Sequence, residues 1–158
     1  MRRAIEHYAA GDWPNPMASD SLTLVFDERH RRRIRLVSDR GAPVLLDLRR
    51  TAAMADGDGL RCDDGAWLAV RAAPEELVEI ACADAHALAR IAWHLGNRHL
   101  PTELSAATLR IRPDHVIEEM VRGLGATVRR VVAPFQPEGG AYANAGHTHL
   151  ERELRHAS

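Results

Sequence analysis

The hydrophobic period changes from two to about 3.6 along this chain of 158 residues, and this change constrains the fold more than any other feature. From residue 21 to about residue 71, apolar side chains alternate with their neighbours in three short stretches, 22–26, 34–36 and 44–48. The turn-rich segment "MADGDGLRCDDGAW" at 54–67 follows them. The first half of the chain is therefore predicted to be a small all-β module.

The second half carries two helix patterns among short strand patterns, beyond a boundary segment "AAPEE" at 72–76. Asp84 is predicted to cap a helix that has apolar residues at i, i+3, i+4 and i+7 and ends at Gly96. A second helix of the same spacing opens at Asp114 and stops at Gly125. Strands are predicted at 77–82, 100–104, 107–111 and 127–135. The resulting βαββαβ order predicts a ferredoxin-like sandwich, in which both helices cover one face of an antiparallel sheet.

We therefore expect an α+β protein in three parts. A β-rich N-terminal domain is expected over residues 1–75 and a ferredoxin-like domain over residues 76–137. A flexible tail is expected over residues 138–158, because this segment is rich in Gly and Ala and has no apolar stripe until a short helix pattern at its end. Glu118 and Arg122 are expected to form an ion pair on the wet face of the second helix.

The composition narrows the classes of partner. Lys and Arg together number 21 and Asp and Glu 22, so no bulk attraction to nucleic acid or to a membrane is implied. No apolar run reaches the roughly 18 residues of a membrane span, and polar residues interrupt the N-terminal stretch where a secretory signal would lie. The protein is therefore expected in the cytoplasm. Cys62 and Cys82 form no CxxC pair, so neither a thiolate metal site nor a disulfide framework is predicted.

His99 is the main candidate metal ligand. It lies just past the predicted end of the first helix, in "RIAWHLGNRHLP" (90–101), where side chains can face outward. One surface imidazole binds a divalent ion weakly, but a homodimer whose two-fold axis passes beside His99 would bring a second imidazole to the same ion. His94 is five residues away, whereas chelation from one helix needs a spacing of three or four, so the two form no clamp. An ordinary surface role for His99 is the alternative.

Three further histidines are candidate ligands. His147 and His149 lie two apart in "GHTH", so an extended chain points both to the same side. His115 lies beside Asp114 at the start of the second helix, and a plain first-turn residue is the alternative. No such grouping surrounds His7, His30 or His156. Imidazole nitrogens without thiolates suit nickel, copper or zinc, and their affinity should fall as the pH drops below about 6.5.

Three motifs follow one another in the second half: "HLGNRHLP" (94–101), "RPDHVIEEMVRGLG" (112–125) and "PFQPEGGAY" (134–142). Together with the later "GHTH", they resemble the urease accessory protein E (UreE) family, the nickel metallochaperones. The resemblance implies a homodimer through the C-terminal domains, in which His99 meets its symmetry mate around one Ni(II) ion. It also implies that His147 and His149 complete the coordination and that His115 is a secondary ligand in some members.

The same resemblance implies the partners. The N-terminal domain is similar to a peptide-binding module of heat-shock co-chaperones, and the family's partner is the urease accessory GTPase UreG, which receives the nickel for insertion into the urease apoprotein complex. Zinc or copper is expected to bind in vitro. The chain departs from the family at Pro113, where some relatives carry a further histidine, and at "ERELRHAS", which lacks a histidine-rich extension. One or two ions per dimer are therefore expected, with no catalytic residue and no enzymatic activity.

One alternative is a zinc-dependent hydrolase. His115 would then hold the metal and Glu118 or Glu119 would act as general base. Such an enzyme needs three fixed ligands and an open position, and no array such as HExxH is present.

A second alternative is an RNA-binding ferredoxin-like module, which the element order and "RHRRRIR" (29–35) suggest. Base stacking needs aromatic side chains on the sheet, and few are present. On a strand, Arg31, Arg33 and Arg35 would face one way, which favours a solvated face or a surface that docks a protein partner.

Overall fold

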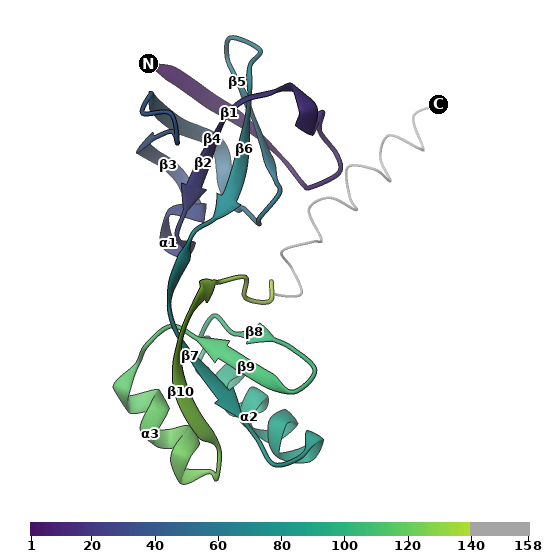
Figure 1. Cartoon of the computed structure of the whole chain (residues 1–158), viewed down its shortest axis with the longest axis vertical. Helices are drawn as coiled ribbons and strands as arrows, with labels where there is room; N and C mark the ends of the chain where they lie inside the picture. The colour runs from purple at the N-terminus through teal and green to yellow at the C-terminus, as the bar shows by residue number, and fades with distance from the viewer. Residues whose placement is uncertain (140–158) are drawn as a thin grey trace.

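The computed structural model describes residues 1–139 and shows two lobes, each built on its own sheet (Figure 1). The predicted ligands His147 and His149, and the tail expected from residue 138 apart from its first two residues, lie outside the described residues. The N-terminal lobe consists of β1 (Arg2–Tyr8), the 3-10 turn η1 (Asn15–Met17), β2 (Ala18–Leu24), α1 (Phe26–Arg29), β3 (His30–Val37), β4 (Pro43–Ala53), β5 (Gly59–Cys62) and β6 (Trp67–Ala72). The C-terminal lobe consists of β7 (Pro74–Ala81), α2 (Ala85–Asn97), β8 (Glu103–Leu104), β9 (Thr108–Ile111), α3 (His115–Gly123) and β10 (Thr127–Pro134).

The N-terminal lobe is a six-stranded sheet in the order β2-β6-β5-β1-β4-β3 that curls around an apolar core (Figure 1). The predicted alternation is confirmed in β2, β3 and β4, whose inward residues, such as Leu22, Leu36 and Leu46, are buried. The prediction missed β1, the strand that pairs with both β4 and β5. Ala4 is the only fully buried residue in β1, so its apolar signal is weak. Phe26, predicted at the end of a strand, opens the short helix α1.

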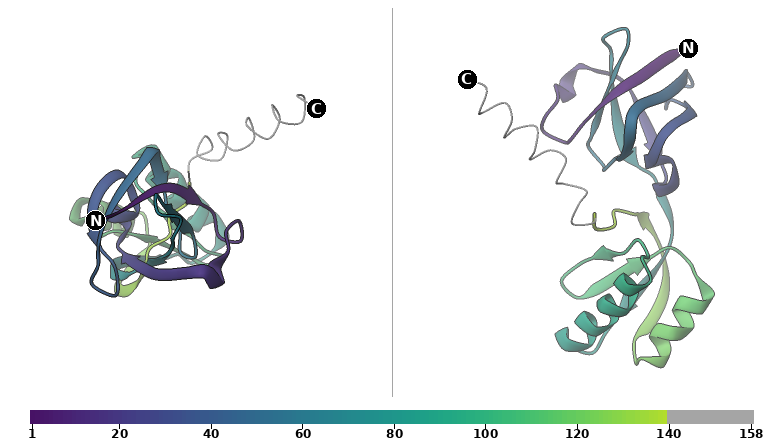
Figure 2. Two further views of the ribbon diagram at one scale, coloured as in Figure 1. Left: turned by 90° about the horizontal axis from the view of Figure 1, so that it is seen from above. Right: turned by 180° about the vertical axis from the view of Figure 1, so that it is seen from behind.

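The C-terminal lobe confirms the ferredoxin-like prediction. Its four strands are antiparallel in the order β10-β7-β9-β8, and α2 and α3 lie on the same face of the sheet (Figure 2). Both predicted caps form, because the Asp84 carboxylate accepts from Ala87 N at 2.8 Å and the Asp114 carboxylate accepts from Ile117 N at 3.2 Å. Within residues 1–139, none of the helices has the length and apolar character needed to cross a bilayer.

The predicted pairing of Glu118 with Arg122 is wrong. Glu118 is buried and faces the sheet, where its carboxylate lies 3.1 Å from Nη2 of Arg130 in β10. The same carboxylate accepts from Asp114 N at 3.2 Å and so closes the first turn of α3. The i,i+4 spacing is compatible with a surface pair, but the buried carboxylate instead meets a half-exposed arginine of the neighbouring strand.

A second buried carboxylate, Glu79, lies in β7 on the sheet face opposite the helices. It accepts from Arg129 Nη2 at 2.6 Å and from Arg110 Nε at 3.0 Å, so one acidic group links the three adjacent strands β10, β7 and β9. The hydrogen bond from Arg129, helped by Arg110, holds the pKa of Glu79 below its ordinary value although burial opposes this.

The two lobes are joined by the segment that follows β10. Phe135 is fully buried and packs edge-on against Phe26 of α1, with ring centroids 5.2 Å apart. Its carbonyl oxygen accepts a hydrogen bond from the buried Arg29, which also donates to the Met54 carbonyl at 3.0 Å. Next in the chain, the Gln136 side chain accepts from Asp56 N at 2.8 Å. The segment that follows the last strand of the C-terminal lobe therefore packs in the N-terminal lobe and is hydrogen-bonded to it.

We predict that Glu79→Gln destabilises the protein most at neutral pH. Because the pKa of Glu79 is lowered in the folded protein from 4.5, its stabilising contribution is complete above that value and declines below it, until the pH has passed the lowered pKa of the folded state. Urea denaturation at about pH 7 should show a large loss in free energy of unfolding relative to the parent, and at about pH 3 a much smaller one. The exposed Glu119→Gln serves as control. An equal loss for Glu79→Gln at both pH values would contradict the assignment.

Candidate metal-binding site around His99

The main candidate ligand, His99, lies at the end of α2 in an uncommon backbone conformation. Its φ is +55°, and it is the only residue other than glycine with positive φ within residues 1–139. Its N–H donates to the Gly96 carbonyl at 3.1 Å, and the Arg98 N–H donates to the Leu95 carbonyl at 3.1 Å. This left-handed position after a helix is usually taken by glycine, because a Cβ there costs about 1 kcal/mol or more. The imidazole is exposed where the chain leaves the helix, as the sequence predicts.

The neighbouring part of α2 presents a large apolar side chain. Trp93 is 63% exposed, and its ring contacts the half-buried ring of His94 edge-on, with centroids 5.0 Å apart. A tryptophan side chain this exposed on a helix is typical of a surface that another molecule covers.

His115 opens α3, as predicted, and is exposed. Its side chain is 87% exposed, and Nε2 lies 4.0 Å from the Glu119 carboxylate. Within the described part of the chain, no group of three or more His, Cys, Asp and Glu side chains could hold a metal ion. A complete set of ligands therefore does not arise from residues 1–139 of one chain.

One surface hollow of about 290 Å³ is lined by sequence neighbours of both candidate histidines, while the two histidines themselves are not among its lining residues. Its lining includes Leu100, which directly follows His99, and Asp114, which directly precedes His115. The structure therefore brings the two backbone segments that carry these histidines to one hollow, although fifteen residues lie between His99 and His115 in the sequence. The full lining is Leu100, Pro101, Ile111, Arg112, Pro113 and Asp114.

The last described residues run beside the segment that follows His99. Gln136 N donates to the Glu103 carboxylate at 3.0 Å, and Glu138 N donates to the Thr102 carbonyl at 2.9 Å. Thr102 follows His99 by only three residues. The sequence does not predict this contact, because Glu138 and Thr102 are far apart in the chain and no sequence pattern links the two segments.

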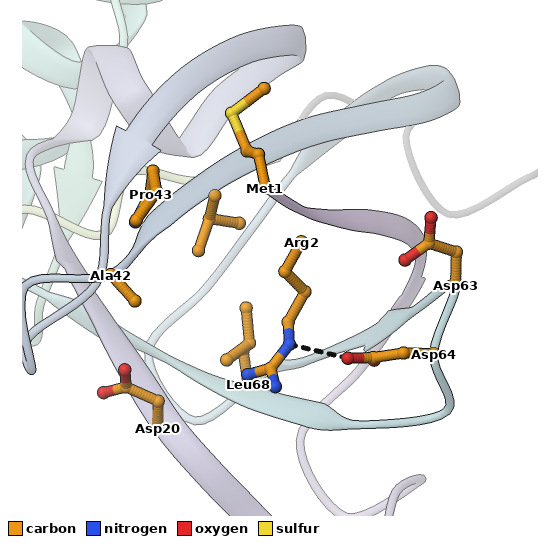
Figure 3. A pocket seen from close by; sticks show the side chains of 9 residues that line it. Met1, Arg2, Asp20, Ala42, Pro43, Asp63, Asp64 and Leu68 are labelled. Carbon is orange, nitrogen blue, oxygen red and sulfur yellow. Dashed lines mark hydrogen bonds and ion pairs between the residues drawn. The ribbon is translucent and has the colours of Figure 1, made fainter.

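The larger hollow of about 490 Å³ belongs to the N-terminal lobe and is not lined by any histidine (Figure 3). Apolar side chains such as Val44 and Leu68 line it together with three aspartates. Arg2 crosses its mouth, with Nε 2.9 Å from the Asp64 carboxylate. Size therefore does not identify the metal site, because the predicted ligands lie in the other lobe.

The sequence missed a histidine–carboxylate pair in the N-terminal lobe. Nε2 of His7 lies 2.7 Å from the Asp58 carboxylate, which also accepts from Ala10 N at 2.9 Å and Ala55 N at 2.8 Å. Burial acts to raise the pKa of Asp58, but the hydrogen bond with His7 and those from the backbone outweigh it, so the pKa is lowered. No short sequence pattern predicts this pair, because β1 and the turn before β5 come together only in the folded sheet.

The chain is similar to one family over nearly all of its length. Residues 2–73 match the family model described as UreE urease accessory protein, N-terminal domain, and residues 75–158 match that of the C-terminal domain. The urease accessory protein UreE of Bradyrhizobium sp. (strain ORS 278) is 56% identical over 132 residues, which are 84% of this chain and 63% of the relative. That of Beijerinckia indica subsp. indica is 50% identical over 149 residues, which are 94% of this chain and 86% of the relative.

The chain thus spans less than two thirds of the Bradyrhizobium relative and most of the Beijerinckia one. Both relatives are named as accessory proteins of an enzyme and not as enzymes. This agrees with the expectation that the chain itself is not an enzyme.

We predict that His99→Gly does not destabilise the protein, although it removes a whole side chain. Glycine adopts the φ of +55° at this position without a Cβ clash. The strain energy that is removed from the folded state should offset the larger conformational entropy that glycine gives to the unfolded chain. Asn97→Gly, at the last residue of α2, should lower the free energy of unfolding by about 0.3 kcal/mol, because asparagine is itself a weak helix former. Thermal and urea unfolding of both variants checks this. A larger loss for His99→Gly than for Asn97→Gly would show that His99 supports the fold.

Proposed function

Because the chain belongs to the UreE family of urease accessory proteins, we propose that it is a nickel carrier that holds Ni(II) between two copies of itself. The observation that carries the proposal is the position of His99. An exposed imidazole occupies a left-handed position where glycine is the ordinary choice, so the fold accepts a strained residue in order to present this side chain.

The donor chemistry fits a borderline transition ion. Imidazole nitrogens bind Ni(II), Cu(II) and Zn(II), so copper and zinc are competitors in vitro. A single chain offers too few grouped donors within residues 1–139, and a two-fold related copy supplies a second His99 without any further sequence. Trp93, six residues before His99, provides exposed apolar area for such a contact. The proposed assembly is therefore a homodimer through the C-terminal lobes.

The proposed additional ligands are His147, His149 and His115. Glu138 is hydrogen-bonded to Thr102, and His147 follows Glu138 by nine residues, so an extended chain reaches up to about 30 Å from that anchor. This span is ample for the two tail histidines to reach His99. The segments that carry His115 and His99 line the same hollow through their neighbours Asp114 and Leu100, and His115 is proposed as a secondary ligand.

The exposure of the ligands suits delivery. A carrier must release its cargo to an acceptor, and ligands on an open surface can be exchanged one at a time without unfolding the protein. The proposed acceptor is the urease accessory GTPase UreG, which passes Ni(II) on to the urease apoprotein complex. The proposed compartment is the cytoplasm, as the sequence predicts. In this scheme nickel is the cargo, and the protein supplies binding and presentation without chemistry on a substrate.

The two alternatives have less support. His115 lies 4.0 Å from the exposed Glu119, whereas Glu118 is buried against Arg130. Within residues 1–139, a hydrolytic centre at the start of α3 therefore lacks the further metal ligands that it needs. Phe135, the aromatic residue at the end of the C-terminal sheet, is buried against Phe26, so it offers no surface for base stacking.

We predict that the parent binds one tightly held nickel ion per dimer and that His99→Ala loses it. Isothermal titration with Ni(II), combined with native mass measurement, gives affinity and stoichiometry together. The affinity of the interfacial ion should fall by about tenfold or more, since removing one residue removes two ligands from the dimer. His86→Ala, which removes an exposed histidine of α2, is the matched control and should bind nickel like the parent. Unchanged nickel affinity in His99→Ala would refute the assignment.

We predict that a chain ending at Ala145 dimerises like the parent but binds nickel more weakly or with lower stoichiometry. The truncation removes His147 and His149 and leaves the segment 135–138 that contacts the folded lobes. Analytical ultracentrifugation measures the dimer, and the same titration measures the metal. Full nickel binding without the tail would remove these two histidines from the proposed ligand set.

A further inference from the structure

The short helix α1 is the part of the N-terminal lobe that faces the C-terminal lobe (Figure 1). Its first residue, Phe26, donates its N–H to the Glu75 carboxylate at the start of β7, at 2.9 Å. The ring of Phe26 packs against Phe135, and its centroid lies 5.0 Å from the guanidinium carbon of Arg112. The next residue, Asp27, forms an ion pair of 2.6 Å with Nη1 of the same arginine. One helical turn therefore contacts three separate segments, at residues 75, 112 and 135, that belong to the C-terminal lobe or leave it.

Arg112 connects α1 to the hollow whose lining includes sequence neighbours of both candidate ligands. It lines this hollow of about 290 Å³ and precedes His115 by three residues. Leu100, which directly follows His99, lines the same hollow. Because Arg112 is held by Asp27, the segment that leads to His115 is attached to the N-terminal lobe.

The segment that follows His99 is attached to the N-terminal lobe as well. Glu103, four residues after His99, accepts a hydrogen bond from Gln136 N at 3.0 Å. The side-chain oxygen of Gln136 accepts in turn from Asp56 N, in the turn between β4 and β5, at 2.8 Å. These two hydrogen bonds of Gln136 join residues 56 and 103, which belong to different lobes. Each of the two segments that carry a candidate ligand therefore has its own link to the N-terminal lobe.

The relative position of these two segments matters for ligands that share one ion. His99 comes directly after the C-cap of α2 and His115 is the first residue of α3, so the position of each depends on a connecting segment at the surface. Surface segments of this kind are the most mobile parts of a fold. Donors that are already held at the right spacing bind an ion more tightly, because less conformational entropy is lost on binding. Contacts that hold both segments should therefore raise the affinity for the ion.

We propose that the N-terminal lobe positions the two ligand-bearing segments, so that the nickel affinity of the C-terminal lobe depends on Asp27 and on Gln136. This inference rests on the proposed nickel-carrier function and adds to it two positioning residues outside the candidate site. A contact can change the affinity by no more than the free energy that it contributes. The side chains of Arg112 and Asp27 are 39% and 65% exposed, and ion pairs this exposed are weak, so a change of about threefold is expected for each contact.

Isothermal titration of the full chain with Ni(II) measures the effect of each contact. Asp27→Asn removes the carboxylate that holds Arg112 and should weaken nickel binding by about threefold. Gln136→Ala leaves every charge unchanged and removes the acceptor of Asp56 N, so a similar loss is expected. Because the two contacts hold different segments, the double variant should lose about tenfold. The matched control is Asp12→Asn, which removes an exposed carboxylate of the same lobe and should bind nickel like the parent.

Hydrogen exchange separates a positioning role from general support of the fold. If the contacts between the lobes favour nickel binding, linkage requires that nickel binding favours these contacts to the same extent. Ni(II) should therefore slow amide exchange in α1, where Glu28 and Arg29 donate to the Val25 carbonyl at 3.1 Å, as mass spectrometry of a fragment covering residues 25–31 would show. In the double variant, Ni(II) should leave this exchange unchanged. Asp27→Glu, which keeps the carboxylate, should behave like the parent in both measurements.

Two results would overturn the proposal while the carrier function stands. One is a nickel affinity of the double variant equal to that of Asp12→Asn, and the other is exchange in α1 of the parent that Ni(II) does not slow. If the double variant loses secondary structure, as circular dichroism would show, the two single variants take its place with the same expected threefold losses. Absence of nickel binding by the parent, or unchanged affinity in His99→Ala, would instead refute the carrier function, and this inference with it.

Discussion

A buried guanidinium holds the two lobes of this protein together. Arg29 is 3% exposed and donates to the carbonyl oxygens of Leu24, Met54 and Phe135, so it links strands of the first sheet to the segment that leaves the second. Burial lowers the pKa of Arg29, and acidic groups, Glu75 foremost, oppose this. A buried ion costs several kcal/mol unless its donors are satisfied, and the carbonyl oxygens satisfy them here. The position of Phe135 is therefore set by the other lobe.

That position decides where the candidate metal site can be completed. Once Phe135 is seated, Gln136 and Glu138 are hydrogen-bonded to the loop at Thr102 and Glu103, immediately after the helix that presents His99. The chain segment that leads to the two tail histidines therefore starts at Glu138, which is hydrogen-bonded to the loop that follows His99. The fold thus contributes a fixed start for the tail and a left-handed helix end at His99, the two features on which the proposed shared metal site depends.

Charge is used in different ways in the two lobes. In the C-terminal lobe, the buried carboxylates Glu79 and Glu118 are each matched by arginines from neighbouring strands, so these charges stabilise the sheet. On the outer face of β3 the arginines outnumber the carboxylates of the described residues, and Asp47, which lies among them, is already hydrogen-bonded to Arg3. Arginines of the first kind stabilise the fold, whereas most of those of the second kind are exposed and form no ion pair within residues 1–139.

Local physics determined much of this protein from its sequence. Alternation in β2 to β4, the capping residues Asp84 and Asp114 and the βαββαβ order were all predictable, because these signals act over a few residues. The outward position of His99 followed from the end of a helix. Tertiary structure alone decided the rest: the place of β1 in the sheet, the burial of Glu118 and the pairing of His7 with Asp58. The hydrogen bond between Glu138 and Thr102 was also decided by the tertiary structure. Each of these contacts joins segments that are far apart in the chain, so it depends on how the two sheets pack and on the buried Arg29 between them.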